Sequence, residues 1–389
     1  MKLSLAVIYT LSFLQIINRI FKTPFFVNKK LRIAGILAAL AASAIILSSP
    51  SQSPPLPSPT EQQDESIKVL ATGLKKPWAL ASVNDTVFVT EKDGSIRVIQ
   101  SDKLLPEPLA TVRAAKVYGG GLLGITVHPD FEKNHFLYVY HTYSENNKLW
   151  NKVLRITESN NKLVDASTII DKIPGSQFYN GGVIKFGPDG KLYVATGLSE
   201  EFSHEAQNPS SLEGKILRLN DDGTIPPDNP FPNSPVLSFG HRDIQGMTWD
   251  NNGNMFVSEL GPTKSDEINL IRPGNNYGWP EQECGGNKKF TDPVMCYDPS
   301  IEPGGIIFYD GNRLDYKNKL IMATLRGSNL YDLDVDENNV KSQKSILSGL
   351  GRIRDVMQGQ DDYLYVITSN TDGKGFPDKT DDKLLRVMK

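Results

Sequence analysis

Residues 181–197 read GGVIKFGPDGKLYVATG, one copy of a pattern that recurs along the chain. An apolar run, Gly182–Phe186, is followed by a Gly-Pro-Asp-Gly turn and then by Leu192–Ala195, a run of apolar and aromatic residues. Short runs of this kind, bounded by turn residues, are typical of paired β-strands. A third strand with a basic residue near its end, Lys215–Leu219, completes the copy.

The pattern occurs six times between residue 66 and the end of the chain. The centres of the first strands are 45, 59, 63, 59 and 50 residues apart, at Leu80, Ile125, Ile184, Met247, Ile306 and Val356. Short strands that repeat at such a period, without a sustained helical pattern, predict an all-β fold, a six-bladed β-propeller over residues 66–389. We expect the isolated strand Ile67–Leu70 to pair with Leu384–Val387 and close the ring.

Two further regions precede the repeat. Residues 1–47 contain two apolar runs separated by basic residues, and the second run, Ile33–Leu47, is shorter than the roughly 20 residues that span a bilayer. It suits a signal-peptide core or a short membrane anchor, with a buried helix as the alternative. The basic residues should stay in the cytoplasm, so we expect an extracytoplasmic, anchored or secreted domain. Residues 48–65, rich in Pro and Ser, predict an extended linker.

Composition limits the possible partners and the redox chemistry. The 389 residues carry a net charge of −3, which gives no electrostatic case for a nucleic-acid partner. The two cysteines, Cys284 and Cys296, predict a disulfide in an exported chain, worth about 3 kcal/mol on the loop-entropy model. Two free buried thiols are the alternative, and two cysteines do not make a zinc site.

Arginines recur at equivalent strand ends. In GRIRDV, Arg352 and Arg354 lie two apart in a strand and project from the same face, as a clamp for carboxylates or phosphate or as a solvated surface pair. Arg242 and Arg326 hold corresponding places in two other blades, so the four predict a cationic pocket for an anionic ligand. Arg242 could instead pair with Asp243.

Six motifs in order resemble the soluble glucose/sorbosone dehydrogenases, also called aldose sugar dehydrogenases. They are GGGLLGITVHPDF, GGVIKFGPDGKLYVATG, GKILRLNDDGTIPPDNPF, FGHRDIQGM, DEINLIRPGNNYGWP and GRIRDV. The resemblance covers about residues 66–389. It implies a propeller that binds pyrroloquinoline quinone (PQQ) through Ca²⁺ and oxidises an aldose sugar to its lactone.

The resemblance also assigns residues on the cofactor side. It implies that the cofactor is bound by Arg242, Asp243, Arg326, Arg352 and Arg354. The Gly261 and Pro262 carbonyls match those that hold the cofactor's Ca²⁺, although a tight turn explains Gly-Pro equally well. Glu267 and Tyr277 match a second, structural Ca²⁺ position.

On the substrate side the sequence departs from the family. Tyr179 stands where the family has its catalytic histidine, and Leu198 replaces an aspartate. Three further departures, at Gly119, Asp243 and Leu260, are expected in the same pocket. Tyr179 and Arg242 are therefore our catalytic candidates.

The departure at Tyr179 has a chemical cost. A phenol of pKa about 10 is a poorer general base than an imidazole of pKa about 6.5, and losing the base costs about a hundred- to ten-thousandfold in rate. His204 is a possible substitute. We expect His128, His135, His141 and His241 to be turn or packing residues.

These observations leave two main hypotheses open. The first is a quinone-dependent sugar dehydrogenase whose activity is altered or lost. The second is a non-catalytic extracytoplasmic propeller that binds an anionic ligand or a protein partner. A Ca²⁺-dependent lactonase is weaker, because no cluster of Glu, Asn and Asp occurs where the blades begin.

Overall fold

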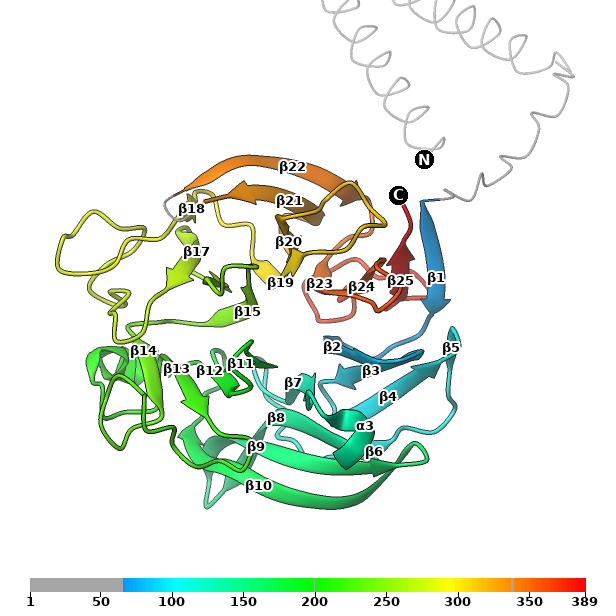
Figure 1. Ribbon diagram of the computed structural model, residues 1–389, viewed down its shortest axis with the longest axis horizontal. Coiled ribbons are helices and arrows are strands. Elements are labelled where there is room, and N and C mark those ends of the chain that lie inside the picture. Colours follow the sequence, from blue (N-terminus) through cyan, green and yellow to red (C-terminus); the bar gives the residue numbers. More distant parts are fainter. Residues whose placement is uncertain (1–65, 199, 337–338) are drawn as a thin grey trace, which may run out of the picture. The chain divides into compact units, whose positions relative to one another are not determined.

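The computed structural model describes residues 66–198, 200–336 and 339–389. Within these ranges, six antiparallel sheets follow one another around a central channel (Figure 1). The six-bladed propeller predicted from the repeat is confirmed. The anchor and linker predicted for residues 1–65 lie outside the described part of the chain. Among the residues that the structure describes, no helix is long and apolar enough to cross a membrane.

The first strand of each blade lines the channel. Each of these strands contacts the first strands of both neighbouring blades. In chain order they are β2 (Pro77–Val83), β7 (Leu122–Val127), β11 (Gly181–Phe186), β15 (Ile244–Trp249), β19 (Pro303–Tyr309) and β23 (Ile353–Gln358).

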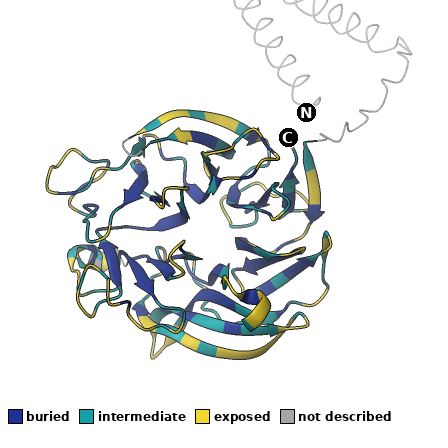
Figure 2. Ribbon diagram, viewed as in Figure 1, coloured by how far each residue is buried: buried dark blue, intermediate teal, exposed yellow. Residues whose placement is uncertain are grey.

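The second and third strands carry many of the buried apolar residues of the core, and Figure 2 shows the buried stretches in dark blue. The second strands are β3 (Thr86–Glu91), β8 (Phe136–Glu145), β12 (Leu192–Thr196), β16 (Met255–Glu259), β20 (Lys319–Thr324) and β24 (Leu364–Thr368). The third strands are β4 (Ser95–Gln100), β9 (Lys148–Ser159), β13 (Lys215–Leu219), β17 (Asp266–Ile271), β21 (Asn329–Val335) and β25 (Leu384–Val387).

The outermost strands lie at the rim of the propeller. They are β5 (Lys103–Leu104) with β6 (Ala110–Thr111), β10 (Lys162–Pro174), β14 (Val236–Phe239), β18 (Met295–Tyr297), β22 (Val340–Ser348) and β1 (Ile67–Ala71). In blade six this strand is β1, whose Ile67 pairs with Val387 of β25. The predicted closure through both ends of the domain is confirmed. Two short helical segments, α3 (Phe131–Asn134) and η1 (Glu200–Gln207), lie in connections.

All six first strands share an irregularity near their beginning. In β11 the register against β12 shifts between Gly181 and Ile184, and in β23 the register against β24 shifts between Ile353 and Asp355. The other four first strands shift at the corresponding place. Such bulges turn side chains away from the regular pleat. They occur at the end of the channel where the candidate site residues lie.

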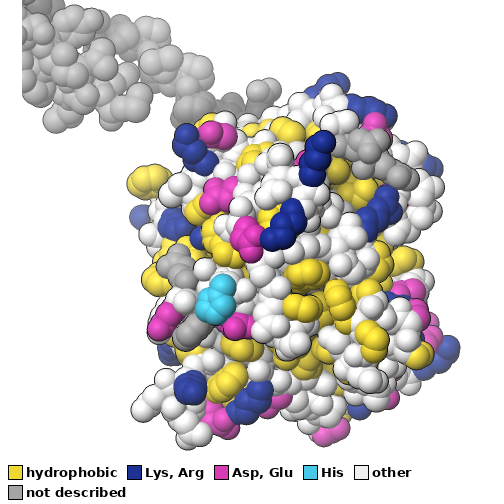
Figure 3. Space-filling view, turned by 90° about the vertical axis from the view of Figure 1, so that its left-hand side faces the viewer, with side chains coloured by type: hydrophobic (Ala, Val, Ile, Leu, Met, Phe, Trp, Pro, Cys, Tyr) yellow, Lys and Arg dark blue, Asp and Glu magenta, His cyan; other side chains and the backbone are white. Residues whose placement is uncertain are grey.

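The predicted disulfide between Cys284 and Cys296 is present, which excludes the alternative of two free thiols. It lies in the long connection between β17 and β18. The edge of the propeller that Figure 3 shows mixes acidic, basic and scattered hydrophobic side chains without a large patch of one sign.

Candidate active site

A pocket of about 230 Å³ opens at the end of the channel where the first strands begin. Six cationic and three anionic side chains line it, and they come from blades one, five and six and from the beginning of blade four. They are Lys92, Arg242, Arg326, Arg352, Arg354 and Lys374, with Asp243, Glu302 and Asp372. The four arginines that the sequence placed at equivalent strand ends therefore do meet in one pocket.

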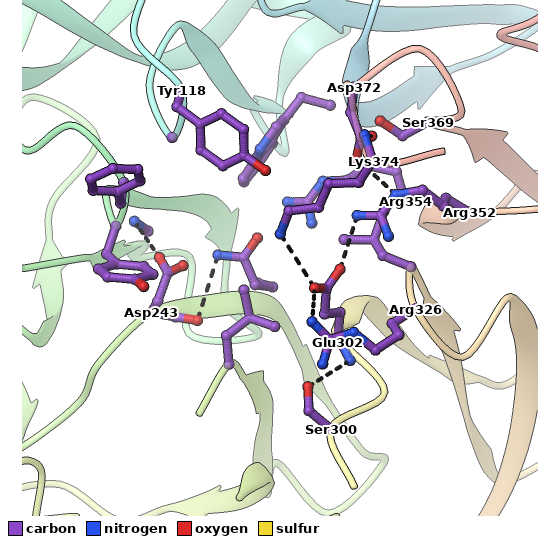
Figure 4. Close-up of a pocket in the computed structure, with 18 of the residues that line it drawn as sticks. Tyr118, Asp243, Ser300, Glu302, Arg326, Arg352, Arg354, Ser369, Asp372 and Lys374 are labelled. Carbon is purple, nitrogen blue, oxygen red and sulfur yellow. Dashed lines mark hydrogen bonds and ion pairs between the residues drawn. The ribbon is translucent and has the colours of Figure 1, made fainter. Parts of the chain in front are cut away.

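Glu302, the residue before β19, is the centre of an ion network on one side of the pocket (Figure 4). Its Oε2 accepts a hydrogen bond from Arg352 Nη2 at 2.9 Å, and its Oε1 lies 2.8 Å from Arg326 Nη2 and 3.3 Å from Lys374 Nζ. Arg352 Nε also donates to Asp372 Oδ2 at 2.8 Å. Arg352 thus joins two carboxylates and is held in place from both sides.

The backbone around Glu302 is fixed by Asp266, the first residue of β17. Asp266 Oδ2 accepts hydrogen bonds from the backbone N–H groups of Ile301 and Glu302, both at 2.8 Å, and from the Ser300 hydroxyl at 2.6 Å. Its Oδ1 accepts from the Gly261 N–H at 3.0 Å. One fully buried carboxylate therefore ties two loops of the pocket together.

The network keeps Glu302 ionised. Burial alone would raise the pKa of this carboxyl, but attraction to Arg352 and Lys374 and the hydrogen bond from Arg352 outweigh burial and lower the pKa below its usual value. Glu302 and Asp372 therefore offset much of the positive charge on Arg326, Arg352 and Lys374.

Two other cations form no ion pair among the described residues, although Lys92 Nζ donates a hydrogen bond to the Tyr118 carbonyl at 2.5 Å. Arg354 is 4% exposed, its guanidinium lies 4.1 Å from the centre of the Trp78 ring, and its Nε has no acceptor among the described residues. Burial, with repulsion from Arg352, lowers the pKa of Arg354 to about 10 against the attraction of Asp355 and Asp243. Burial and repulsion from Arg354 lower the pKa of Lys92 to about 8. An anion bound between Arg354 and Lys92 would stabilise the charged forms of both side chains.

Arg242 lies on the opposite side, in the connection between β14 and β15. Its Nη1 donates to the carbonyl oxygens of Leu260 at 3.1 Å and Gly261 at 2.8 Å. Its guanidinium lies 4.0 Å from the centre of the Tyr179 ring, within the range of a cation–π contact. The alternative that Arg242 simply pairs with Asp243 does not describe this geometry, because the guanidinium bonds to carbonyl groups.

Four of the five predicted departures line the pocket, but Leu198 does not. Tyr179, Gly119, Leu260 and Asp243 are lining residues, whereas Leu198 is 1% exposed within the core. The expectation that all five fall in one pocket was wrong for Leu198, because a leucine after β12 gains more by burial than by facing a charged cavity.

Close packing explains the glycine at position 119. A Cβ there would lie 1.6 Å from the Phe178 carbonyl oxygen, and the Gly119 N–H donates to the Gln177 carbonyl at 2.7 Å. The loop that carries Tyr179 therefore lies directly against Gly119, where no other residue fits without displacing that loop.

None of the five histidines lines the pocket, and all five lie in the described ranges. His204 on η1 is an exposed side chain beside Glu205, so the structure does not favour it as a substitute base. His128 packs among aromatic rings, His135 ends α3 and His141 is buried in β8. His241 is buried, hydrogen-bonded to Glu259 and stacked on Tyr277. The predicted turn and packing roles of these four are confirmed.

The positions matched to Ca²⁺ are already paired within the protein. The Gly261 carbonyl faces the Arg242 guanidinium, so a cation does not fit there unless Arg242 moves away. The Tyr277 hydroxyl donates to the Leu270 carbonyl and accepts from the Arg272 N–H, while Glu267 accepts from the Cys284 N–H and from Asn269. The described residues contain no group of three or more His, Cys, Asp or Glu side chains placed to hold a metal.

Sequence reasoning missed Lys92, Glu302, Asp372 and Lys374. A simple rule would have found two of them: Glu302 directly precedes a first strand, as Arg352 does, and Lys92 directly follows a second strand. Because the first and second strands of a blade are antiparallel, the beginning of one lies beside the end of the other, so residues at both places lie at the same end of the channel. Asp372 and Lys374 lie further along an irregular loop, which gives no such signal.

Comparison with known proteins agrees with this geometry. The pattern of the family described as glucose/sorbosone dehydrogenase matches residues 74–386. The chain belongs to this family. Aldose sugar dehydrogenase YliI of Escherichia coli is 32% identical over 342 residues, which cover 79% of this chain and 91% of that protein. Quinoprotein glucose dehydrogenase B of Acinetobacter calcoaceticus is 32% identical over 285 residues, 63% of this chain and 57% of that protein.

A solved structure of the family extends the comparison to a bound cofactor. The PQQ-bound aldose sugar dehydrogenase of Streptomyces coelicolor is 37% identical, with a TM-score of 0.75 over 82% of this chain and 97% of that one. In the present chain, Arg354 and Lys92, which form no ion pair among the described residues, lie beside the Glu302 network and fit a planar ligand with several carboxylates. The donor set thus suits PQQ.

Proposed function

We propose that this protein is a PQQ-dependent oxidoreductase that oxidises an aldose sugar at its anomeric carbon to the lactone. The observation that carries the proposal is the pair Arg354 and Lys92, two cations that line the pocket and form no ion pair among the described residues; burial lowers the pKa of both, with repulsion from Arg352 acting on Arg354 and repulsion from Arg354 acting on Lys92. Holding such charges together costs stability unless an anion joins them. A cofactor with carboxylate groups would supply that anion.

The residues divide into two groups by position. Arg326, Arg352, Arg354, Lys92 and Lys374 would hold the carboxylates, with Glu302 fixing the orientation of three of them. When bound, PQQ supplies a two-electron acceptor for the hydride of a sugar C1–H bond.

The opposite side of the pocket would contact the sugar. Arg242 presents a guanidinium that is held by two carbonyls and by the Tyr179 ring. Tyr118 and Phe178, each 53% exposed, pack together beside the pocket, where their rings can exclude water and contact a sugar face.

Calcium at the Gly261 and Pro262 carbonyls stays a prediction, as does the second position at Glu267 and Tyr277. The first requires the Arg242 guanidinium to leave Gly261. PQQ titrations of chelator-treated protein, with and without Ca²⁺, test it: an affinity unchanged by Ca²⁺ would contradict the first position.

An extracytoplasmic location and membrane attachment through residues 1–47 also remain proposals. The Cys284–Cys296 disulfide supports export, because such bonds persist in oxidising compartments. Labelling of intact cells with a membrane-impermeant reagent would test the extracytoplasmic location, and a domain that is protected from the reagent would contradict this location.

A second candidate function is a propeller that binds an anionic ligand or a protein partner without catalysis. The observation that favours it is the absence of all five histidines from the pocket lining, together with a tyrosine at the family's base position. The cationic side of the pocket would then be used for binding alone.

One experiment separates the two functions. PQQ is added to the purified chain, its binding is followed by absorbance, and aldose-dependent reduction of a dye is followed in parallel. The dehydrogenase proposal expects both signals. Binding without turnover supports the second candidate, and no binding contradicts the cofactor assignment.

A further inference from the structure

Asp243 introduces a carboxylate on the side of the pocket that has lost the family's histidine. It directly precedes β15, and the family resemblance implies an asparagine at this position. The chain therefore differs from the family at both Tyr179 and Asp243. These residues lie close together, because the Asp243 carboxylate bonds to Gly181, the first residue of β11.

The geometry of Asp243 is well defined. Its Oδ1 accepts a hydrogen bond from the Gly181 N–H at 2.9 Å, two residues after Tyr179, and its backbone carbonyl accepts from the Leu260 N–H at 3.0 Å. The side chain lines the pocket and is 4% exposed. No donor in the described ranges reaches Oδ2, which leaves one carboxylate oxygen for a ligand. Figure 4 shows Asp243 across the pocket from the Glu302 network.

Gly181 makes this anchoring possible. Its backbone has a φ of 60°, and a Cβ would lie 2.6 Å from the Ala195 carbonyl oxygen. Only glycine fits this place without displacing β12, so the N–H that holds Asp243 is set by the fold of blade three.

We propose that Asp243 accepts the proton of the substrate's C1 hydroxyl in this chain. This inference rests on the proposed dehydrogenase function. In the step, the hydroxyl O–H bond breaks and its proton passes to Asp243 Oδ2. The C1–H bond breaks, its electron pair leaves as hydride to the quinone-class acceptor, and the C1–O bond becomes a carbonyl.

The electrostatic surroundings support this role. Burial raises the pKa of Asp243 to about 7, with Glu259 adding to the shift and Arg242, Arg354 and the Gly181 hydrogen bond opposing it. A base whose pKa lies near the working pH is the most effective kind. The charged or titratable groups that interact with Asp243 are Arg242 beside it, Glu259 of β16, Arg354 of β23, Lys92 after β3 and Tyr140 of β8.

The first test is made on the cofactor-free protein. Carboxyl ¹³C NMR should show a group with a midpoint near pH 7 that is missing in Asp243→Asn. In unfolded wild type the Asp243 carboxyl ionises near pH 4, whereas in the folded protein it stays protonated up to about pH 7, so wild type loses stability between these pH values. The melting temperature of Asp243→Asn relative to wild type should therefore rise between about pH 4 and pH 7 and then level off. A titration unchanged by Asp243→Asn overturns the proposal.

The second test uses PQQ-loaded protein. In wild type, kcat/KM for dye reduction should rise about tenfold per pH unit below 7 and then level off. In Asp243→Asn it should fall about a hundred- to ten-thousandfold and lose this dependence, with PQQ still bound.

A matched control is Asp355→Asn. Asp355 is another buried carboxyl with a raised pKa, but it lines the channel and not the pocket. Asp355→Asn should keep the pH dependence near 7. Wild-type activity whose pH dependence survives in Asp243→Asn overturns the inference but leaves the dehydrogenase function intact. If PQQ-loaded wild type shows no turnover, both the dehydrogenase function and the role of Asp243 are overturned, whereas the assignment of PQQ as a bound ligand still stands.

Discussion

The two sides of the pocket are built on different principles. On the side of blades five and six, Glu302 and Asp372 hold Arg326, Arg352 and Lys374 in a network of ion pairs, and Asp266 fixes the loop beneath them. On the side of blades three and four, Arg242 bonds to carbonyl groups and contacts an aromatic ring, and one Asp243 oxygen has no donor among the described residues.

This difference indicates where the family's chemistry can change. In the ion network Glu302 and Arg352 each bond to more than one opposite charge, so losing either residue leaves another charged side chain without its ion-pair partner. The opposite side holds its polar groups through backbone contacts, which tolerate a change of side chain. The departures from the family that the sequence resemblance predicts lie mostly around Tyr179, whereas the predicted cofactor arginines Arg326, Arg352 and Arg354 lie across the pocket.

The largest effect should follow the loss of Arg352. Arg352→Met leaves Glu302 and Asp372 without their shared partner inside a mostly buried network. Breaking such a pair costs about 3–5 kcal/mol in the free energy of unfolding. Urea denaturation of cofactor-free protein would measure this cost.

Lys374→Met is the matched control. Lys374 contacts the other oxygen of Glu302, Oε1, but its side chain is 46% exposed, so its removal should cost at most about 1 kcal/mol. Equal losses in the two variants would contradict the view that burial makes Arg352 the centre of the network.

A smaller effect is expected from Glu302→Gln. This change should lower the free energy of unfolding by about 1–3 kcal/mol through lost charged hydrogen bonds. It should also strengthen the binding of inorganic pyrophosphate about tenfold, because three cations lose their competing anion. Isothermal titration calorimetry would show the gain, and weaker binding would mean that Glu302 mainly orients the cations.

The stability difference between wild type and Glu302→Gln should also depend on pH. The pKa of Glu302 is lowered in the folded protein, so its contribution is present above the usual carboxyl pKa of about 4 and is lost as the pH falls through the lowered value. Melting curves of the two proteins should therefore converge in acid. A constant gap would show that the charge of Glu302 is not what stabilises the network.

The sequence predicted the strands that carry apolar residues, including β1, but not the outer strands of the other blades. β10 and β22 are long and largely exposed, with polar sequences that give no alternating pattern. Their strand conformation comes from pairing with β9 and β21, which sequence periodicity does not detect.

The same limit applies within the pocket. Arg352 and Arg354 were predictable because they lie two apart in a strand, and a strand fixes the direction of its side chains. The partners Asp372 and Lys374 come from an irregular loop, and the burial of Leu198 depends on how blade three packs. No local pattern specifies either feature.

The smallest effects should distinguish the ring of Tyr179 from its hydroxyl. The ring lies 4.0 Å from the Arg242 guanidinium, a contact worth about 0.5–2 kcal/mol, so Tyr179→Ala should lower stability by that amount. Tyr179→Phe keeps the ring and should leave kcat/KM within about threefold of wild type at every pH, because the phenol is not the proton acceptor proposed for this pocket. Steady-state kinetics of the PQQ-loaded variants from pH 5 to 9 would decide. A hundredfold loss in Tyr179→Phe would assign the proton transfer to Tyr179 and leave Asp243 as a structural carboxylate.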